Sequence, residues 1–323
     1  MNATVKLEKK HFPVLLNELT SIISPLYSGT FIDCTFGQGG YTGQILKNKK
    51  NKVIALDRDK KTAIDARGFE NKFNDNFEFK NIRFSEVNNL NLENEKLKAV
   101  IFDLGYSTNQ ILDPDKGLSF NTKGKLNMQM GLNQFSAHEV INNLNNKDLE
   151  KIFKYYGEEN KSRIISKKIC EIRKNKIIKT EDLVKIINQV KFKNKSKINS
   201  STKIFQSLRI FVNKEISELM FGLINAFNIL PIGGMIVVVS FHSIEDRIVK
   251  YFFKNFSEIK NPSRYLPYET ENAVLFKSVK SKPIVPTKKE QKINPPSRSA
   301  KLRYAIKIKD AENFDEFIKK FQN

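Results

Sequence analysis

The sequence predicts an α/β fold, with a parallel sheet and crossover helices, interrupted by an all-helical insertion. Between residues 30 and 103, short apolar runs alternate with polar stretches of helix length, which is typical of such a sheet. Most of these runs end in or contain a carboxylate, which would lie at the edge where an open α/β sheet binds ligands. We expect strands over residues 31–35, 53–57, 77–82, 99–103, 235–240 and 302–308.

Beyond the fourth of these strands the pattern becomes helical, with apolar side chains three or four residues apart. Core-type sequence returns with one long helix, expected over residues 204–230 and ended by a proline. We therefore assign residues 1–112 and 204–323 to a core domain. Residues 113–203 form an inserted helical domain, which we expect to recognise the substrate.

The charge of the chain favours a polyanionic partner. With 56 lysines and arginines against 35 acidic residues, the formal net charge is +21 and the pI about 9.7. Clustered basic side chains gain free energy by releasing counterions from phosphates, so a nucleic acid fits better than a membrane surface. The alternative is that many of the lysines only solvate helix faces.

Composition and targeting signals favour a folded protein of the cytoplasm. A chain of 323 residues that is 40% hydrophobic can bury a sizeable core. The first ten residues hold no apolar leader segment, and the longest apolar run, 235–239, is too short to span a bilayer. Cys34 and Cys170 lie far apart, without the spacing of a disulfide framework or a zinc site. We expect neither membrane insertion nor a metal.

A glycine-rich turn follows the first expected strand, in the segment Asp33-Cys34-Thr35-Phe36-Gly37-Gln38-Gly39-Gly40. Glycines let the backbone approach a ligand closely, and the start of the next helix offers free N–H groups. The spacing does not match the dinucleotide fingerprint, because the residue three after Gly39 is Thr42 and not glycine. A nicotinamide dinucleotide is therefore disfavoured. The alternative is that the glycines only make a tight strand-to-helix connection.

S-adenosylmethionine fits this turn better. It has no pyrophosphate, and it needs a carboxylate at the end of the second strand for its ribose hydroxyls. Asp57 directly ends that apolar run, whereas Asp59 is expected to cap the next helix. Phe84, after the third strand, is placed either to lie against the adenine or to pack in the core. Cys34 lies inside the end of the first strand, which makes it a poor candidate for a nucleophile.

Six motifs follow one another along nearly the whole chain. They are His11-Phe12-Pro13-Val14-Leu15-Leu16, the segment from Asp33 to Gly40, Asp57-Arg58-Asp59, Asp103-Leu104-Gly105, Ser240-Phe241-His242-Ser243-Ile244-Glu245-Asp246-Arg247 and Arg298-Ser299-Ala300-Lys301-Leu302-Arg303. In this order they resemble the family of bacterial ribosomal RNA small subunit methyltransferase H, the 16S rRNA (cytosine-N4)-methyltransferases. The block around His242 is the most specific of the six.

The resemblance implies a class I S-adenosylmethionine-dependent methyltransferase core, which is Rossmann-like, with the inserted all-helical domain. It also implies methylation of the N4 amine of cytidine 1402 in 16S rRNA of the small ribosomal subunit, near the decoding centre. Tyr41 stands where the family usually has histidine, which a backbone contact would tolerate. Carried over by motif position, the cofactor contacts fall on Gly39, Gly40, Tyr41, Asp57, Phe84, Asp103 and Gln110.

Two segments depart from the family pattern. Where Pro-Leu-Asp-Met-Arg-Met is usual, this chain has residues 125–130 with Asn127 and Gln129, and so lacks a carboxylate and a guanidinium. Where His-Pro-Ala-Thr-Arg is usual, it has the stretch from Asn199 to Lys203. Both segments are expected on the substrate side, so these departures bear on the choice of RNA site and not on cofactor binding.

The chemistry calls for a proton acceptor. The exocyclic amine of cytosine is a poor nucleophile, so the site must orient it and accept a proton as the methyl group arrives. Many amino methyltransferases place an Asp/Asn-Pro-Pro-aromatic turn after the fourth strand, and here Asp103-Leu104-Gly105-Tyr106 fills that place. We expect Asp103 and the Leu104 carbonyl near the amine. Phe36, Tyr106 and Phe120 are either aromatic walls around the reacting pair or core residues.

His242 follows a strand at the ligand-binding edge, and two hypotheses describe it. It would contact the flipped base or take the proton of the amine. Alternatively it closes the turn, and Ser243 caps the next helix with Asp246 three residues on.

The expected partner is 16S rRNA in the small ribosomal subunit, with an unpaired or flipped target cytidine. We expect RNA contacts from Arg298, Lys301, Arg303, the lysines of residues 277–292, Lys203 and Arg209. Two other functions remain open: an amino methyltransferase acting on DNA or another RNA, and a non-catalytic RNA-binding assembly factor. The sequence does not distinguish a monomer from a homodimer.

Overall fold

The computed structural model describes residues 13–92, 96–106, 110–111, 113–120, 125–133, 135–191, 201–257, 274–277, 282–311 and 313–322. The chain forms two compact units. The first, here called the core unit, comprises Met1–Gly105 and Met220–Asn323, and the second, the helical unit, is Tyr106–Leu219. Among the described residues, no helix combines the length and the apolar character that crossing a membrane requires.

The core unit is built on one six-stranded sheet with the strand order β3-β2-β1-β4-β5-β6. The first five strands in this order run parallel, and β6 is antiparallel to β5. Each strand lies within a few residues of its expected position, and the α/β fold class is confirmed. The strands are β1 (Thr30–Asp33), β2 (Lys52–Leu56), β3 (Phe77–Lys80), β4 (Leu97–Asp103), β5 (Met235–Ser240) and β6 (Lys301–Ile306).

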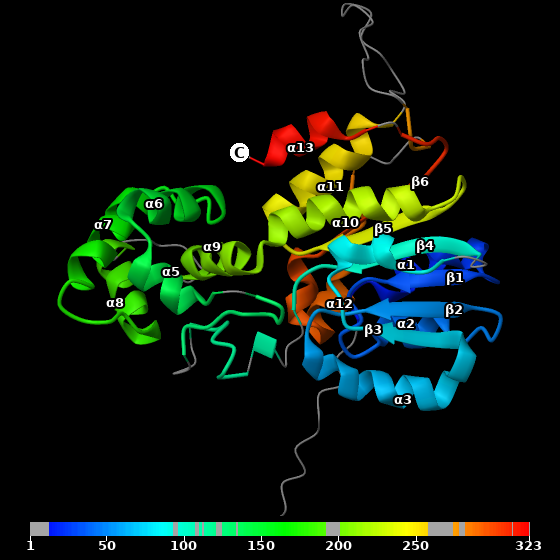
Figure 1. The fold of residues 1–323 in the computed structure, drawn as a ribbon, viewed down its shortest axis with the longest axis horizontal. Coiled ribbons are helices and arrows are strands. Elements are labelled where there is room, and N and C mark those ends of the chain that lie inside the picture. The colour runs from blue at the N-terminus through cyan, green and yellow to red at the C-terminus, as the bar shows by residue number, and fades with distance from the viewer. Residues whose placement is uncertain are drawn as a thin grey trace, which may run out of the picture. The chain divides into compact units, whose positions relative to one another are not determined.

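Helices cover both faces of the sheet, as the apolar strands require. Side chains alternate between the faces of a strand. On β4, Ala99 and Ile101 pack into an apolar cluster with side chains of α1, α2 and α3, whereas Phe102 faces Gly222 of α10. Figure 1 shows α3 on one side of the sheet and α10 and α11 on the other. The helices that contribute to this unit are α1 (Leu16–Ile23), α2 (Gly40–Ile45), α3 (Ala63–Phe73), α10 (Glu215–Ile229), α11 (Ser243–Asn255), α12 (Lys288–Ile293) and α13 (Asp315–Phe321).

The helical unit has an apolar core of its own, made of leucine, isoleucine, valine and phenylalanine side chains. Helix α5 is capped by Ser136, which forms a capping box with Glu139: each side chain accepts a hydrogen bond from the other residue's backbone N–H. The helices whose bounds lie in the described part of this unit include α5 (Ala137–Asn143), α6 (Asn146–Tyr155), α7 (Ser162–Ile172), α8 (Thr180–Lys191) and α9 (Thr202–Asn213).

The prediction of a single helix over residues 204–230 is wrong. This segment forms two helices, α9 and α10, because Lys214 between them takes a left-handed conformation with φ 51°. Ile204, Phe205 and Leu208 of α9 are buried in the core of the helical unit. The helical unit therefore begins before and ends after the expected span of 113–203, and the helix that was assigned to the core domain contributes to both units.

Candidate active site

The turn after β1 requires its glycines. Gly37 and Gly39 have φ angles of 54° and 73°, in the region that side chains rarely adopt. A Cβ on Gly39 would lie 2.5 Å from the Phe69 ring, and one on Gly40 would lie 2.1 Å from Cγ of Pro13. The close packing that the sequence suggested as an alternative is therefore real, and it brings the start of α2 close to the end of β1.

Asp33, at the end of β1, organises this turn. It is buried, its Oδ2 accepts a hydrogen bond from the Thr42 hydroxyl at 2.7 Å, and its Oδ1 accepts one from the Thr35 N–H at 3.2 Å. The Thr35 hydroxyl oxygen in turn accepts a hydrogen bond from the Asp103 N–H at 2.7 Å. The Thr35 side chain thus joins the ends of β1 and β4. Sequence reasoning gave Asp33 no role, although a carboxylate that ends an apolar strand was a signal for one.

Asp57, just after β2, lies beside the same turn. Its Oδ2 accepts a hydrogen bond from the Gly37 N–H at 2.9 Å, and its Oδ1 accepts one from the Asp59 N–H at 2.8 Å. Burial raises the pKa of Asp57 to about 6, against the lowering effect of the two backbone N–H groups. Asp59 caps the next turn of helix through the Lys61 N–H, as expected. Asp57 therefore stands at the tip of β2 with a carboxylate fixed by the glycine turn.

The raised pKa of Asp57 predicts a pH dependence of stability. The folded protein holds this proton up to about pH 6, whereas the unfolded chain releases it near pH 4, so the folded state binds more protons between these values. Stability of the ligand-free protein should therefore fall as pH rises through this window, by about 3 kcal/mol from Asp57 alone. Urea unfolding of the wild-type and Asp57→Asn proteins between pH 4 and 7.5 measures this effect. A difference in unfolding free energy that is constant with pH would contradict it.

Asp103 ends β4 with a buried oxygen that has no partner. Its Oδ1 is out of contact with solvent and accepts no hydrogen bond from the described residues. Burial, followed by the charges of Asp33 and Glu245, holds the pKa of Asp103 well above its usual value. An unpaired buried acceptor is costly, and such groups in native proteins call for a donor from elsewhere. A ligand with an N–H donor would satisfy it.

The three strand-end carboxylates Asp33, Asp57 and Asp103 share one electrostatic feature. The pKa of each is raised, first by burial, and the charge of Asp33 raises those of Asp57 and Asp103 further. Negative charge on these groups is therefore disfavoured at this edge, and a bound cation would lower their pKa values and favour the charged forms. An anionic dinucleotide would raise these pKa values further, in agreement with the spacing of the glycines.

Two further residues of the predicted cofactor site flank this edge. The Tyr41 side chain is buried and its hydroxyl donates a hydrogen bond to the Val14 carbonyl, so only its backbone is available to a ligand. Phe84 opens a short 3₁₀ helix after β3 and packs edge-on against Phe102, with ring centroids 5.5 Å apart. Its ring also lies against Gly222, and the residue is partly exposed, so Phe84 is packed in the core without being fully covered.

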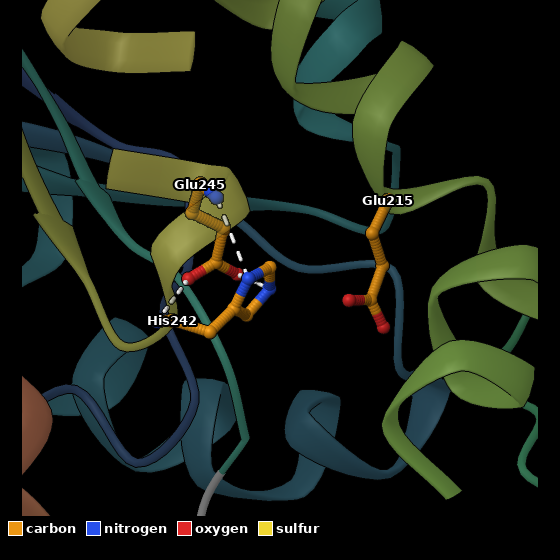
Figure 2. Close-up of side chains that lie close together, drawn as sticks. All are labelled: Glu215, His242 and Glu245. Carbon is orange, nitrogen blue, oxygen red and sulfur yellow. Dashed lines mark hydrogen bonds and ion pairs between the residues drawn. The ribbon is translucent and has the colours of Figure 1, made fainter. Parts of the chain in front are cut away.

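His242 begins α11 at the end of β5, and Figure 2 shows its ring beside the Glu245 carboxylate. Its Nδ1 accepts the Glu245 N–H at 3.4 Å, while its Nε2 lies 3.0 Å from Glu245 Oε1. Glu245 Oε2 accepts hydrogen bonds from the N–H groups of Phe241, at 2.9 Å, and of His242, at 3.3 Å. The cap is thus His242 with Glu245, and the expected pairing of Ser243 with Asp246 is wrong.

Known proteins resemble this chain along nearly its whole length. A family model described as the MraW methylase family matches residues 8–308. The chain belongs to this family. It is therefore a methyltransferase. Relatives named ribosomal RNA small subunit methyltransferase H are 41% identical in Rickettsia bellii, over 94% of this chain and 100% of theirs, and 39% identical in Ehrlichia canis, over 92% and 100%. A solved rRNA methylase from Streptococcus thermophilus aligns over 93% of this chain and 99% of its own, with 10% identity and a TM-score of 0.39.

Several aromatic and sulfur side chains of this methylase are core residues. Phe36 is buried among the rings of α3 and β3, 5.3 Å from that of Phe69. Phe120 packs edge-on against Phe205 inside the helical unit. Burial, followed by the charge of Asp33, raises the pKa of Cys34 well above its usual value, which agrees with excluding it as a nucleophile. The role of Phe36 and Phe120 as walls of the reacting pair is not supported.

Gln110 and Tyr106 belong to the helical unit, so their part in the site remains a prediction. The Arg209 guanidinium lies over the Tyr106 ring, 4.1 Å from its centroid, and forms a bidentate pair with Glu215 at 2.8 Å. Lys203 donates to the Glu158 carbonyl at 2.8 Å. These two cations, which the sequence assigned to RNA, are thus engaged within the helical unit.

Two more of the expected RNA contacts are engaged within the core unit. Lys301 Nζ lies 2.9 Å from Asp246 Oδ2, and Arg303 Nε lies 2.7 Å from Asp246 Oδ1. Arg303 is buried, so its assignment to RNA is wrong. Burial alone would raise the pKa of Asp246, but the hydrogen bonds from Arg303 and Lys301 outweigh it and lower the pKa. Arg298 is exposed, while of the basic segment only residue 277 and residues 282–292 are among those described.

The segments that depart from the family pattern differ in what the structure tells of them. In the first, Leu126 and Met128 are buried, and Asn213 binds the backbone on either side of Gln129: its Nδ2 donates to the Met128 carbonyl and its Oδ1 accepts the Met130 N–H. Asn127 and Gln129 alternate with the buried side chains. Asn127 Nδ2 donates to the Asp115 carbonyl at 3.2 Å, and its Oδ1 is buried and accepts no hydrogen bond from the described residues. In the second, residues 199 and 200 lie outside the described part, as do His11 and Phe12 of the first motif.

Proposed function

We propose that this methylase transfers the methyl group of S-adenosylmethionine to the N4 amine of cytidine 1402 in 16S rRNA. The observation that carries the proposal is Asp103: a buried carboxylate oxygen without a donor, at the end of β4 and beside the glycine turn. The family and the names of the relatives support methylation of small-subunit rRNA. The choice of nucleoside rests on the amine chemistry that Asp103 suits.

The residues at the carboxyl edge of the sheet fit S-adenosylmethionine, which supplies an electrophilic methyl group on a sulfonium. Asp57 would accept hydrogen bonds from the ribose hydroxyls, and Phe84, which is partly exposed, would lie against the adenine. The backbone from Gly39 to Tyr41 would receive the amino-acid part, with Gln110 completing the site. A cation bound beside the three strand-end carboxylates would favour their charged forms, which burial alone disfavours, so this edge suits a sulfonium better than an anionic nucleotide.

Asp103 is the proton acceptor in this proposal. A buried carboxylate with a raised pKa is a stronger base than an ordinary aspartate, and it suits an amine that becomes acidic only as the new bond forms. The Leu104 carbonyl follows directly and would orient the second hydrogen of the amine. Leu104 N–H donates to the Val239 carbonyl at 2.9 Å, which holds this turn at the end of the sheet.

His242 has a different part. In neutral imidazole one nitrogen accepts and the other carries the proton. Because Nδ1 accepts the Glu245 N–H, the proton is placed on Nε2, which lies 3.0 Å from Glu245 Oε1 but forms no hydrogen bond with the described residues. His242 would therefore offer this N–H as a donor to the substrate, and it is poorly placed to take the amine proton. We assign it to positioning, next to the strand end where Asp103 acts.

The substrate must present an accessible amine, so cytidine 1402 is bound flipped or in a single-stranded segment. We assign recognition of the surrounding RNA to the helical unit. We also propose that the protein acts on small subunits in the cytoplasm.

Methyl transfer from labelled S-adenosylmethionine to small ribosomal subunits that lack the modification tests the proposal. We expect one labelled nucleoside, N4-methylcytidine, at position 1402, and none in subunits that already carry it. Label in DNA, or at another amine, would replace this substrate by one of the other amino methyltransferase functions. Failure to bind S-adenosylmethionine by calorimetry, together with binding of subunits, would favour an assembly factor without catalysis.

A further inference from the structure

Three lysines line the exposed face of α6. Lys147, Lys151 and Lys154 stand at positions i, i+4 and i+7, which places them on one side of the helix. All three are exposed, and the buried residues Leu149 and Ile152 occupy the opposite side. With a rise of about 1.5 Å per residue, the three charges extend over about 10 Å. This row of lysines is here called the α6 basic face.

The next helix adds to it. α6 packs against α7, and both helices bury one side in the same apolar core of the helical unit. Arg163 and Lys167 are exposed and stand one turn apart near the start of α7, which follows the end of α6 after a short connection. The exposed sides of both helices point away from that shared core.

These cations differ from those that the sequence assigned to RNA. In the described part of the chain, the three lysines of the α6 basic face, Arg163 and Lys167 form no salt bridge. Lys301 and Arg303, by contrast, pair with Asp246, and Arg209 pairs with Glu215. Cations without an acidic partner retain their capacity to displace counterions from phosphates.

An exposed aromatic ring adjoins the charges. Tyr155 is 61% exposed at the end of α6, and the ammonium group of Lys154 lies 5.9 Å from the centre of its ring. A tyrosine this open contributes little to the core of the helical unit. Aromatic rings beside basic side chains serve as stacking platforms for unpaired bases.

We propose that the α6 basic face, with Arg163, Lys167 and Tyr155, is an RNA-binding surface that contacts the phosphates of 16S rRNA. The inference rests on the proposed function for the identity of the RNA. The solvent-exposed ring favours RNA over an acidic protein, because unpaired bases provide a planar partner that acidic side chains lack. Among the described residues of α6 and α7, Tyr155 and Ile164 are the only large apolar side chains that are exposed, too few for the apolar face that binding to a lipid surface requires.

Binding of a 16S rRNA fragment, measured by fluorescence anisotropy between 50 and 300 mM salt, tests this surface. The variant replaces Lys147, Lys151 and Lys154 by Gln, and the matched control replaces Lys47, Lys49 and Lys50, which are exposed in the core unit. Loss of three phosphate contacts should flatten the plot of log affinity against log salt by about 2 and weaken binding by about 10- to 100-fold at 100 mM. The control variant should change neither the salt slope nor the RNA affinity by more than about twofold. Tyr155→Ala should weaken binding without changing the slope.

Calorimetric binding of S-adenosylmethionine shows whether each variant retains its core unit. An equal loss of RNA affinity in the α6 variant and in the control would overturn the proposal, because it would show non-specific attraction by net charge. So would an α6 variant that loses affinity for small subunits but not for naked rRNA, since the partner would then be an acidic protein. Because RNA binding is measured without methyl transfer, a wild-type protein that binds but does not methylate cytidine 1402 would refute only the proposed function.

Discussion

An Asp103→Asn protein is expected to transfer methyl groups about 100- to 10,000-fold more slowly than the wild type, the range that a positioned general base contributes. Asparagine has the shape of aspartate but cannot take a proton at neutral pH. The rate to measure is a single turnover with enzyme in excess over small subunits, because product release then does not hide the chemical step.

The fold should survive this change. The Oδ1 atom of Asp103 has no hydrogen-bond donor in the described structure, and the carboxylate sits in a region where its charge is disfavoured. Removing that charge costs the ligand-free protein no hydrogen bond at this atom, so its melting temperature should equal or exceed that of the wild type. Calorimetry should still detect S-adenosylmethionine binding, since Asp57 and the glycine turn are unchanged.

The pH profile separates a proton acceptor from a residue that only shapes the site. Because the pKa of Asp103 is raised, the carboxylate forms only above that value, and the wild-type rate should fall as pH is lowered through it. The asparagine variant should lack this acid limb.

His242→Ala is the matched comparison. It removes a helix cap and a donor but leaves Asp103 in place, so we expect a loss below about 100-fold with the acid limb retained. A deeper loss in His242→Ala than in Asp103→Asn, with cofactor binding intact in both, would assign the proton to His242 and contradict this mechanism.

Local sequence was sufficient to predict the sheet and its ligand-binding edge. Each strand is a short apolar run bounded by polar residues, and β1 and β5 are buried along their whole length, so hydrophobic pattern alone marks them. Because parallel strands share one carboxyl edge, placing Asp57 and Asp103 at strand ends also placed them at that edge. The glycine turn could also be found from local sequence, because its backbone conformation is unfavourable for residues other than glycine.

Predictions that depended on tertiary partners failed. The break at Lys214 carries no glycine or proline, and a lysine in a left-handed conformation has no local signature, so α9 and α10 were taken as one helix. The sequence also assigned Arg303 to RNA, because nothing local shows that Asp246 lies opposite it. Those residues are far apart along the chain and meet only because β6 pairs with β5 and α11 packs against both.

An Asp246→Ala protein is expected to lose about 3–5 kcal/mol of stability, the usual cost of breaking a buried ion pair by removing one partner. Arg303 is buried on β6 and its Nε lies 2.7 Å from Asp246 Oδ1, so the change leaves a buried guanidinium without this carboxylate. For a domain of this size the melting temperature should fall by about 6–20 °C. Asp246 also stands in the first turn of α11, where its charge favours the positive end of the helix.

Two variants show whether burial causes the effect. Lys301 binds the same carboxylate but is 38% exposed, so Lys301→Met should cost less than about 1 kcal/mol. The double variant Asp246→Leu with Arg303→Met removes both buried charges and should recover most of the loss. If Asp246→Ala costs no more than Lys301→Met, the pair is effectively solvated and the argument fails.

The pH dependence of this pair has the opposite sign to that of Asp57. The pKa of Asp246 is lowered by folding, so its contribution is complete above the unfolded value of about 4 and is lost as pH falls toward the folded value. The stability difference between wild type and Asp246→Ala should therefore shrink below about pH 4. The pair also links α11 to β6 one turn beyond His242, so the same variant should reduce methyl transfer at temperatures where the protein is still folded. Normal transfer there would show that α11 is held at the site without this ion pair.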